Sequence, residues 1–187
     1  MDNTDIEFIP LEKADLELVR NWRNSPDVSK YMYSGDYISP EQQENWFRKI
    51  NSDPAQKYWL FAENGKKLGL VSVYNINSKF QTCHWAFYIG DPMGRKKGIG
   101  SKVEFKLLDY VFNELKMNKL IGEVLSFNTS VISMHEKFGF RREGYLREHI
   151  MKDGVFHDVV CIGLLRSEWE YLREYNYNRI YCQEEIQ

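Results

Sequence analysis

The sequence of 187 residues lacks most features of membrane, secreted and nucleic-acid-binding proteins. No apolar run approaches the roughly 20 residues that span a bilayer, so we expect no membrane association. The N-terminal segment is polar and acidic and shows no secretory signal, which favours a cytoplasmic protein. The formal net charge of −2 lacks the basic excess of a nucleic-acid binder, so we expect no nucleic-acid partner.

Cysteines are few, and proline-rich linkers and internal repeats are absent. The three cysteines, Cys83, Cys161 and Cys182, have neither disulfide pairing nor metal-ligand spacing, so we expect reduced thiols and no bound metal. Without a linker or a repeat, the length suits one domain. We expect that domain to span residues 1–187, with its core at 5–170 and a C-terminal tail at 171–187.

The sequence does contain an alternation of strand-like and helix-like segments. Alternating apolar residues predict strands, and apolar residues at a 3.6-residue period predict helices. The pairs Asn64-Gly65 and Asp153-Gly154 each predict a tight hairpin. The predicted strands cover 6–10, 58–63, 68–74, 82–89, 119–125, 144–151 and 155–165. The predicted helices cover 14–24, 40–50, 98–115, 128–138 and a tail from 167, whose end at 176–187 is expected to be loose. This order predicts a mixed α/β sheet.

The junction between the strand at 82–89 and the next helix carries glycines and cations together. Three cations at 95–97 precede Gly98 and Gly100, which begin the helix. A helix N-terminus offers unpaired N–H groups and a positive dipole end, and small residues let an anion come close. The junction therefore predicts a site for a pyrophosphate. The alternative is an ordinary glycine helix start with basic residues facing water.

Later motifs make this junction more specific. Arg95, Gly98 and Gly100 form the pattern Arg-x-x-Gly-x-Gly, which is followed by a helix, a strand, Asn128 and then Gly139-Phe140. This order resembles the GCN5-related N-acetyltransferases (GNAT) over residues 58–165. The resemblance implies a mostly antiparallel sheet of about seven strands, about four flanking helices and a C-terminal helix. It also implies acetyl-CoA as co-substrate, no metal, and direct attack by an amine in a ternary complex.

A closer resemblance concerns the sugar-nucleotide acetyltransferases of pseudaminic acid synthesis. It rests on residues 21–27, 31–33, 123–128, 143–148 and 153–158. It implies acetylation of the 4-amino group of a UDP-linked 4-amino-4,6-dideoxy sugar. The motifs of the second half are shared with acetyltransferases of ribosomal-protein N-termini and of polyamines, so both remain alternatives. An alternative outside enzymes is a catalytically idle acyl-CoA-binding module.

The family resemblance also implies which residues bind the cofactor. Ile89-Gly90 would offer an N–H group to the thioester carbonyl, and Asn128 would hold the pantetheine arm, although Asn128 is equally well placed as a plain helix N-cap. The pyrophosphate would be held by the amides of Lys96, Lys97, Gly98, Ile99, Gly100 and Ser101, with charge-assisted bonds from Arg95.

His135 stands where the family commonly places a tyrosine that protonates the departing thiolate. Val131, Met134 and Phe138 share one helical face with it, so we expect His135 to point inward. A free imidazole has a pKa of ~6.5 against ~10 for a tyrosine, so it carries the proton only partly at neutral pH. His135 is therefore predicted as an acid, as a hydrogen-bond donor, or as a buried packing residue.

The candidates for the general base lie on strands. Glu123 alternates with Ile121 and Leu125, and apolar neighbours of this kind would raise the pKa of a carboxyl group. We therefore expect Glu123 to be the base, with His84 second. Glu148 and His149 on the last hairpin are weaker candidates.

The acceptor is expected between the first two helices and the last hairpin. Arginine and lysine side chains there would meet a diphosphate, and tyrosines would stack on a uracil or sugar. The predicted cations are Arg20, Arg23 and Lys30, and the predicted aromatic residues are Tyr31, Tyr33 and Tyr37. Trp22 and Trp46 are predicted as core anchors. The tyrosine-rich segment 171–181 is expected to pack on its own domain or against a second copy, which leaves a homodimer open.

Overall fold

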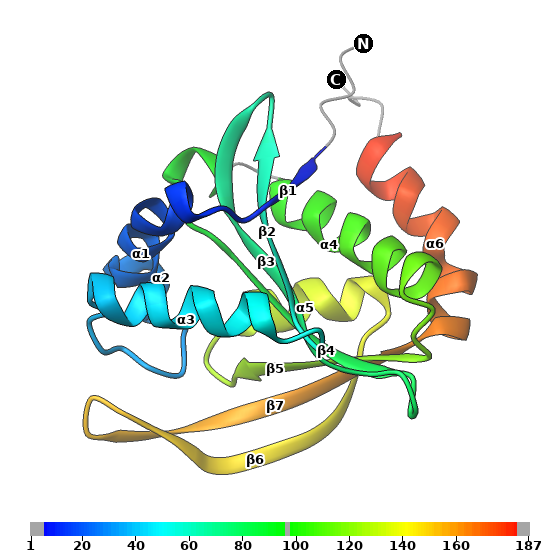
Figure 1. The fold of residues 1–187 in the computed structure, drawn as a ribbon. Helices are drawn as coiled ribbons and strands as arrows, with labels where there is room; N and C mark the ends of the chain where they lie inside the picture. Colours follow the sequence, from blue (N-terminus) through cyan, green and yellow to red (C-terminus); the bar gives the residue numbers. More distant parts are fainter. Residues whose placement is uncertain (1–5, 96–97, 183–187) are drawn as a thin grey trace, which may run out of the picture.

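A computed structural model describes residues 6–95 and 98–182 of the chain. They form a seven-stranded sheet in the order β1-β2-β3-β4-β5-β7-β6, with helices on both faces (Figure 1). The strands are β1 (Glu7–Pro10), β2 (Lys57–Glu63), β3 (Lys66–Asn77), β4 (Thr82–Ile89), β5 (Lys119–Leu125), β6 (Arg141–Lys152) and β7 (Val155–Leu165). The helices are α1 (Leu16–Asn24), α2 (Pro26–Ser29), α3 (Pro40–Ser52), α4 (Ile99–Asp109), α5 (Thr129–Phe138) and α6 (Arg166–Tyr181). Short turns of helix are η1 (Lys13–Asp15), η2 (Pro92–Arg95) and the π-helical η3 (Tyr110–Glu114). The predicted mixed, mostly antiparallel sheet with a C-terminal helix is confirmed.

The pairing of β4 with β5 sets the shape of the sheet. It is parallel, whereas every other neighbouring pair of described strands is antiparallel. The two strands pair only from Thr82↔Lys119 to His84↔Ile121, although β4 continues to Ile89 and β5 to Leu125. The second halves of the two strands therefore separate, and the sheet opens at its centre.

Two hydrophobic cores lie on opposite faces of the sheet. The larger core packs α4, α5 and α6 on the sheet and includes Val103, Phe138 and Trp169. The smaller core packs α1 on β2 and β3 through Trp22 and Leu60. Alternate side chains of one strand point to opposite faces, so β2 and β3 each supply both cores. Figure 1 shows α4 and α6 side by side on the larger core.

The turns and helix ends agree closely with the sequence. Asn64 and Gly65 have φ of +52° and +73°, and Asp153 and Gly154 have +50° and +78°, as tight hairpins with right-handed twist require. The Ser39 hydroxyl accepts a hydrogen bond from the Gln42 backbone N–H and begins α3. The predicted helix 98–115 is confirmed, and its last turn, residues 110–114, is π-helical.

The C-terminal helix differs from its prediction. α6 continues to Tyr181, and Asn176 is fully buried within it, so the expected looseness is wrong for 176–181. Trp169 anchors the helix by packing edge-on against Phe105 of α4, with ring centroids 5.2 Å apart. The segment 171–181 was expected to pack either on its own domain or against a second copy, and it packs on its own domain. Across 6–95 and 98–182, the helices are too short or too polar to cross a membrane.

Trp22 fixes the N-terminal segment to the end of β4. Its indole packs on the backbone of Gly90, where an added Cβ would lie 2.2 Å from Cδ2 of the ring. Trp22 is buried in the smaller core, and Trp46 packs edge-on against Tyr58 beside that core. Both tryptophans are thus core anchors, as predicted.

The close packing at Gly90 generates a stability prediction. Gly90→Ala is expected to lower the free energy of unfolding by about 1–3 kcal/mol, because the new methyl overlaps the Trp22 ring. Gly144→Ala is the matched control, since its Cβ would meet Cys161 Cβ at an ordinary 3.5 Å. Urea unfolding of both variants measures the difference. Equal stability of the two would contradict the proposed close packing of Trp22 on Gly90.

Candidate active site

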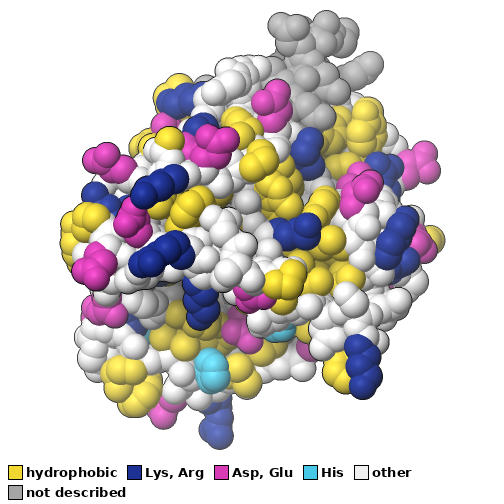
Figure 2. Space-filling view, in the orientation of Figure 1, with side chains coloured by type: hydrophobic (Ala, Val, Ile, Leu, Met, Phe, Trp, Pro, Cys, Tyr) yellow, Lys and Arg dark blue, Asp and Glu magenta, His cyan; other side chains and the backbone are white. Residues whose placement is uncertain are grey.

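A cleft of about 570 Å³ lies where β4 and β5 separate. Its lining includes the second halves of both strands, one face of α5 and residues 27, 28 and 31–33. Figure 2 shows hydrophobic side chains gathered in a hollow of the surface between the regions of α3 and the β6–β7 hairpin. The separation of two strands leaves backbone groups without strand partners, so this opening can bind a ligand through main-chain hydrogen bonds.

The N-terminus of α4 forms one end of the cleft. Gly98 is its N-cap with φ of +99°, a conformation that favours glycine. Gly100 lines the cleft, and an added Cβ there would meet Met134 Sδ only at 3.4 Å, so protein packing does not require glycine. The bare backbone at Gly100 therefore suits a ligand that approaches the helix amides. Ile99 is buried in the core below, and Ser101 follows on the same helix. The predicted ligands Lys96 and Lys97 lie outside the described residues.

The backbone of Ile89 and Gly90 supports half of the prediction for the thioester. The Gly90 N–H donates to the Leu68 carbonyl at 2.9 Å, so the Gly90 part of the prediction is wrong. Gly90 and Leu68 therefore form a hydrogen-bonded pair of the antiparallel ladder. Because the two kinds of pair alternate, the next pair, Ile89 with Gly69, is a non-hydrogen-bonded pair. The Ile89 N–H consequently points away from β3, toward the opening left by β5. Ile89 also lines the cleft.

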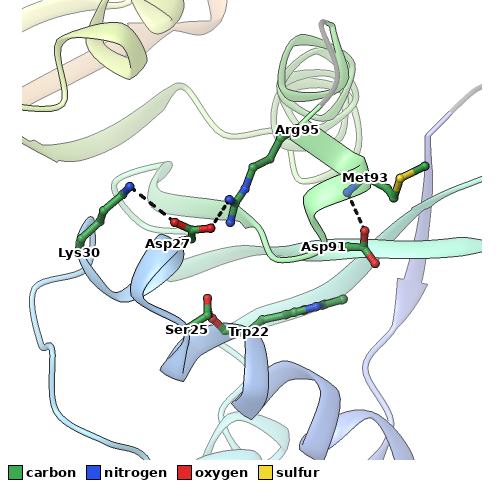
Figure 3. Close-up of polar contacts among 7 residues, drawn as sticks. All are labelled: Trp22, Ser25, Asp27, Lys30, Asp91, Met93 and Arg95. Atoms are coloured by element: carbon green, nitrogen blue, oxygen red, sulfur yellow. Dashed lines mark hydrogen bonds and ion pairs between the residues drawn. The ribbon is translucent and has the colours of Figure 1, made fainter.

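Arg95 links the cofactor end of the cleft to the N-terminal segment. Its Nη1 lies 2.6 Å from Oδ2 of Asp27 on α2, and Lys30 lies 3.8 Å from Oδ1 of the same carboxylate (Figure 3). The hydrogen bond from Arg95 holds the pKa of the Asp27 carboxyl below its usual range. Both Arg95 and Asp27 line the cleft. The guanidinium thus lies beside the predicted pyrophosphate site, with some of its donors directed to Asp27.

Asn128 occupies the N-cap position of α5, but its side chain makes no capping bond. Its Oδ1 instead accepts a weak bond from the Ser130 hydroxyl at 3.4 Å, and both residues line the cleft. The plain-cap interpretation of this side chain is therefore wrong. Its placement in the cleft is compatible with the predicted contact to pantetheine.

His135 is buried and lines the floor of the cleft, so the predicted inward direction is confirmed. Its Nδ1 lies 2.9 Å from Oε1 of Glu104 on α4. The ring also packs edge-on against Trp85, with centroids 4.9 Å apart, and lies beside Phe140. These contacts fix the imidazole in one orientation at the cleft.

Glu123 lies on β5 at the other end of the cleft and is exposed, unlike the apolar environment expected from its strand neighbours. The Tyr33 hydroxyl donates to Oε2 of Glu123 at 2.8 Å. Burial, and then the bond to Glu123, raise the pKa of Tyr33 above its usual range, so its hydroxyl keeps the proton. Burial and the charge of Glu123 likewise raise the pKa of Tyr74 to about 12. Tyrosine hydroxyls therefore surround one carboxylate.

Lys152 at the tip of the β6–β7 hairpin binds the segment that carries Tyr33. Its Nζ donates to the carbonyls of Ser29 and Met32, at 2.5 and 3.0 Å. Burial lowers the pKa of this ammonium group. The last hairpin therefore closes the acceptor end of the cleft, where Tyr31 also lies.

Several predicted residues lie outside the lining of the cleft. Arg20 donates to the Tyr37 hydroxyl, and Arg23 donates to the Ser34 carbonyl and is partly buried near Tyr88. Arg20, Arg23 and Tyr37 thus stabilise the loop at 34–38 outside the lining, and their contact with the acceptor stays a prediction. Lys30 is exposed beside Asp27 and over the Tyr31 ring, also outside the lining.

The remaining base candidates also lie away from the cleft. His84 belongs to the last parallel pair before the strands separate and lies against Tyr74, behind the lining. The Glu148 backbone N–H donates to Oδ1 of Asp158, and His149 is exposed on the hairpin.

Sequence reasoning missed Glu104, Asp27, Tyr74 and Lys152. For Glu104 a signal existed, because it lies on the arc of α4 that Val103 and Leu107 mark as buried. For Lys152 there was none, because its partners lie 123 and 120 residues away in the chain.

Known proteins resemble this chain over most of its length. The family model described as an acetyltransferase (GNAT) domain matches residues 5–141. Spermidine N(1)-acetyltransferase of Vibrio cholerae is 27% identical over 168 residues, which cover 89% of this chain and 96% of that protein. Acetyltransferase PseH of Campylobacter jejuni is 27% identical over 133 residues, which cover 71% and 81%. The crystal structure of the V. cholerae spermidine N-acetyltransferase with CoA and spermine gives a TM-score of 0.84 at 25% identity and covers 90% of this chain and 99% of that one.

The chain belongs to the GNAT acetyltransferase family. It is an acetyl-CoA-dependent N-acetyltransferase that acts on a small-molecule amine. The cleft fits that co-substrate, because the bare backbone at Gly100, the α4 N-terminus and the Ile89 N–H line one continuous opening.

Substitution of Gly100 is expected to stabilise the free protein and to weaken the binding of acetyl-CoA. Gly100→Ala is expected to raise the free energy of unfolding by up to about 0.5–1 kcal/mol, since alanine favours the helix. The same methyl points toward the cleft residues Met134 and Phe87 and would displace a pyrophosphate from the amides. We expect KM for acetyl-CoA to rise about tenfold, the loss of one charge-assisted bond.

Thermal unfolding of the free protein and steady-state kinetics measure the two effects. Ser133→Ala on the exposed face of α5 is the control, because alanine also favours that helix. It should raise the free energy of unfolding slightly and leave KM for acetyl-CoA unchanged. An unchanged KM in the stabilised Gly100→Ala protein would contradict a pyrophosphate at this helix start.

Proposed function

We propose that this acetyltransferase moves the acetyl group of acetyl-CoA to the 4-amino group of a nucleotide-linked 4-amino-4,6-dideoxy sugar. The observation that carries this proposal is the composition of the acceptor end. Among the described residues that line the cleft, Asp27 and Glu123 are the acidic ones, and Asp27 is paired with Arg95. One carboxylate among three tyrosines, Tyr31, Tyr33 and Tyr74, suits a single amine on a ring that offers hydroxyl groups.

The chemistry assigns different proton-transfer roles to the two ends of the cleft. Glu123 accepts the proton that the attacking amine must lose, and Tyr33 holds that carboxylate through Oε2, which leaves Oε1 for the substrate. The Ile89 N–H donates to the oxyanion that develops on the thioester. His135, on the cleft floor, donates a proton to the departing thiolate in place of the usual tyrosine.

A polyamine is the second candidate acceptor. It is favoured by the likeness to spermidine acetyltransferase over nearly the whole chain and by the fold match to its complex with spermine. A polyamine carries several positive charges along its length, so its binding calls for several unpaired carboxylates. The resemblance of residues 21–33 to sugar-nucleotide enzymes favours the sugar instead.

Acetyl transfer to a panel of amines tests the proposal. The panel contains a UDP-4-amino-4,6-dideoxy sugar, the same sugar without UDP, spermidine, and a peptide with a free N-terminus. We expect thiol release from acetyl-CoA with kcat/KM for the amino sugars at least about tenfold above spermidine. Comparison of the two sugars measures the contribution of the nucleotide.

Two variants test the roles at the acceptor end. Glu123→Gln is expected to lower kcat about 100-fold, because the general base is lost. Tyr33→Phe, which keeps the ring, should lower it less and should raise KM for the sugar. Efficient turnover of spermidine with none of either sugar would contradict the proposed acceptor and would establish the polyamine instead.

A further inference from the structure

Glu104 is a fully buried carboxylate on the inner face of α4, between apolar residues of the larger core. Its Oε1 lies 2.9 Å from Nδ1 of His135. Its Oε2 has no hydrogen-bond partner within the described part of the chain. Neighbouring positions such as Val103 and Leu107 show that this surface otherwise takes hydrophobic side chains.

A buried carboxylate of this kind is costly for the fold. Removing a carboxylate from water costs several kcal/mol, and replacement of a buried ion pair by hydrophobic residues is often neutral or stabilising. Core stability therefore gives no reason for a glutamate at this position. The contact with His135, at the floor of the catalytic cleft, gives a chemical reason.

The contacts of His135 leave one ring nitrogen for chemistry. Nδ1 is engaged by Glu104, and the rings of Trp85 and Phe140 hold the imidazole plane. Nε2 is then the remaining polar atom of a side chain that lines the cleft. A carboxylate that accepts from Nδ1 keeps the proton on that nitrogen and fixes the tautomer, so Nε2 gains and loses the second proton.

We propose that Glu104 is a positioning residue for acetyl transfer, which holds His135 with Nδ1 protonated and Nε2 directed to the leaving thiolate. This inference rests on the proposed role of His135, but it does not depend on the identity of the acceptor. The Glu104–His135 pair thereby replaces a tyrosine as the acid.

The proton balance of the transfer is as follows. The amine nitrogen forms a bond to the thioester carbonyl carbon and loses one proton to Glu123. The carbon–sulfur bond then breaks, and its electron pair stays on sulfur. Nε2 of His135 gives its proton to that sulfur, so the products are an amide and the CoA thiol. The proton on Glu123 leaves to solvent, and the imidazole regains one from solvent.

Among the described residues, Glu104 is the charged side chain that contacts the His135 ring. The side chains against the His135 ring are Trp85 from β4 and Phe140, which directly precedes β6, and neither titrates in water. Glu104 from α4 is the ionisable side chain bonded to it. The pH dependence of the acid is therefore expected to respond to substitution at Glu104.

Glu104→Gln tests the proposal, because it keeps the size of the side chain and an oxygen for Nδ1 while removing the charge. We expect kcat to fall about 10- to 100-fold with KM for acetyl-CoA unchanged. We also expect the pH profile of kcat to change. Asp109→Asn is the matched control on the same helix, because Asp109 binds Trp169 and Arg173 away from the cleft and should leave the profile unchanged.

A double variant tests whether the two residues act together. Glu104→Gln in a His135→Gln background is expected to be no slower than His135→Gln alone, since the carboxylate acts through the imidazole. Independent, multiplicative losses would overturn the proposal, and so would a Glu104→Gln enzyme with full kcat and an unchanged profile. Full activity of His135→Gln would overturn the role of His135 itself, with any acceptor that the enzyme uses.

A spectroscopic measurement of the wild-type protein does not depend on activity. The chain has four histidines, so ¹⁵N-histidine labelling gives a small set of imidazole signals, and His135→Gln identifies the one of interest. In the wild-type protein at alkaline pH we expect the neutral His135 ring to carry its proton on Nδ1. A proton on Nε2 with a bare Nδ1 would overturn the proposal, because Glu104 would then be the donor.

Discussion

The separation of β4 from β5 is the constraint on which the whole site depends. Pairing stops at His84 and Ile121, so the last five residues of β4 face an opening instead of a strand. The turn that follows leads through η2 to the N-terminus of α4, which brings a positive helix end to the same opening. One interruption in the sheet therefore brings together a backbone donor, a positive helix end and a cleft of about 570 Å³.

Packing outside the cleft keeps this opening in shape. Trp22 lies on Gly90, where the chain leaves β4, and Lys152 binds the carbonyls of residues 29 and 32 from the opposite side. The buried indole is the stronger of the local anchors, because exposed ion pairs such as Arg95 with Asp27 contribute little in water. The N-terminal segment therefore lines one side of the cleft and is held at both contacts. Its Tyr33 hydroxyl lies 2.8 Å from Oε2 of Glu123.

Much of this fold could be predicted because local chemistry specifies it. The Asn64-Gly65 and Asp153-Gly154 turns require positive φ, and the bounds of β4, β5 and β7 follow from apolar patterns. The acceptor contacts were less predictable. Arg20 and Arg23 suggested a phosphate by charge alone, yet their partners are a tyrosine and a carbonyl of the following loop. Likewise, the burial of Glu104 and the reach of Lys152 depend on contacts between distant segments, which periodicity does not encode.

The central claim is that acetyl-CoA enters the sheet between β4 and β5, with its thioester between the Ile89 N–H and His135. A crystal structure of the protein with CoA and an unreactive acetyl-CoA analogue tests it most directly. The account predicts the pyrophosphate at the α4 N-terminus, the analogue carbonyl within hydrogen-bond distance of the Ile89 N–H, and the sulfur position facing Nε2 of His135. A pantetheine arm that lies outside the opening, or a carbonyl that faces away from Ile89, would contradict it.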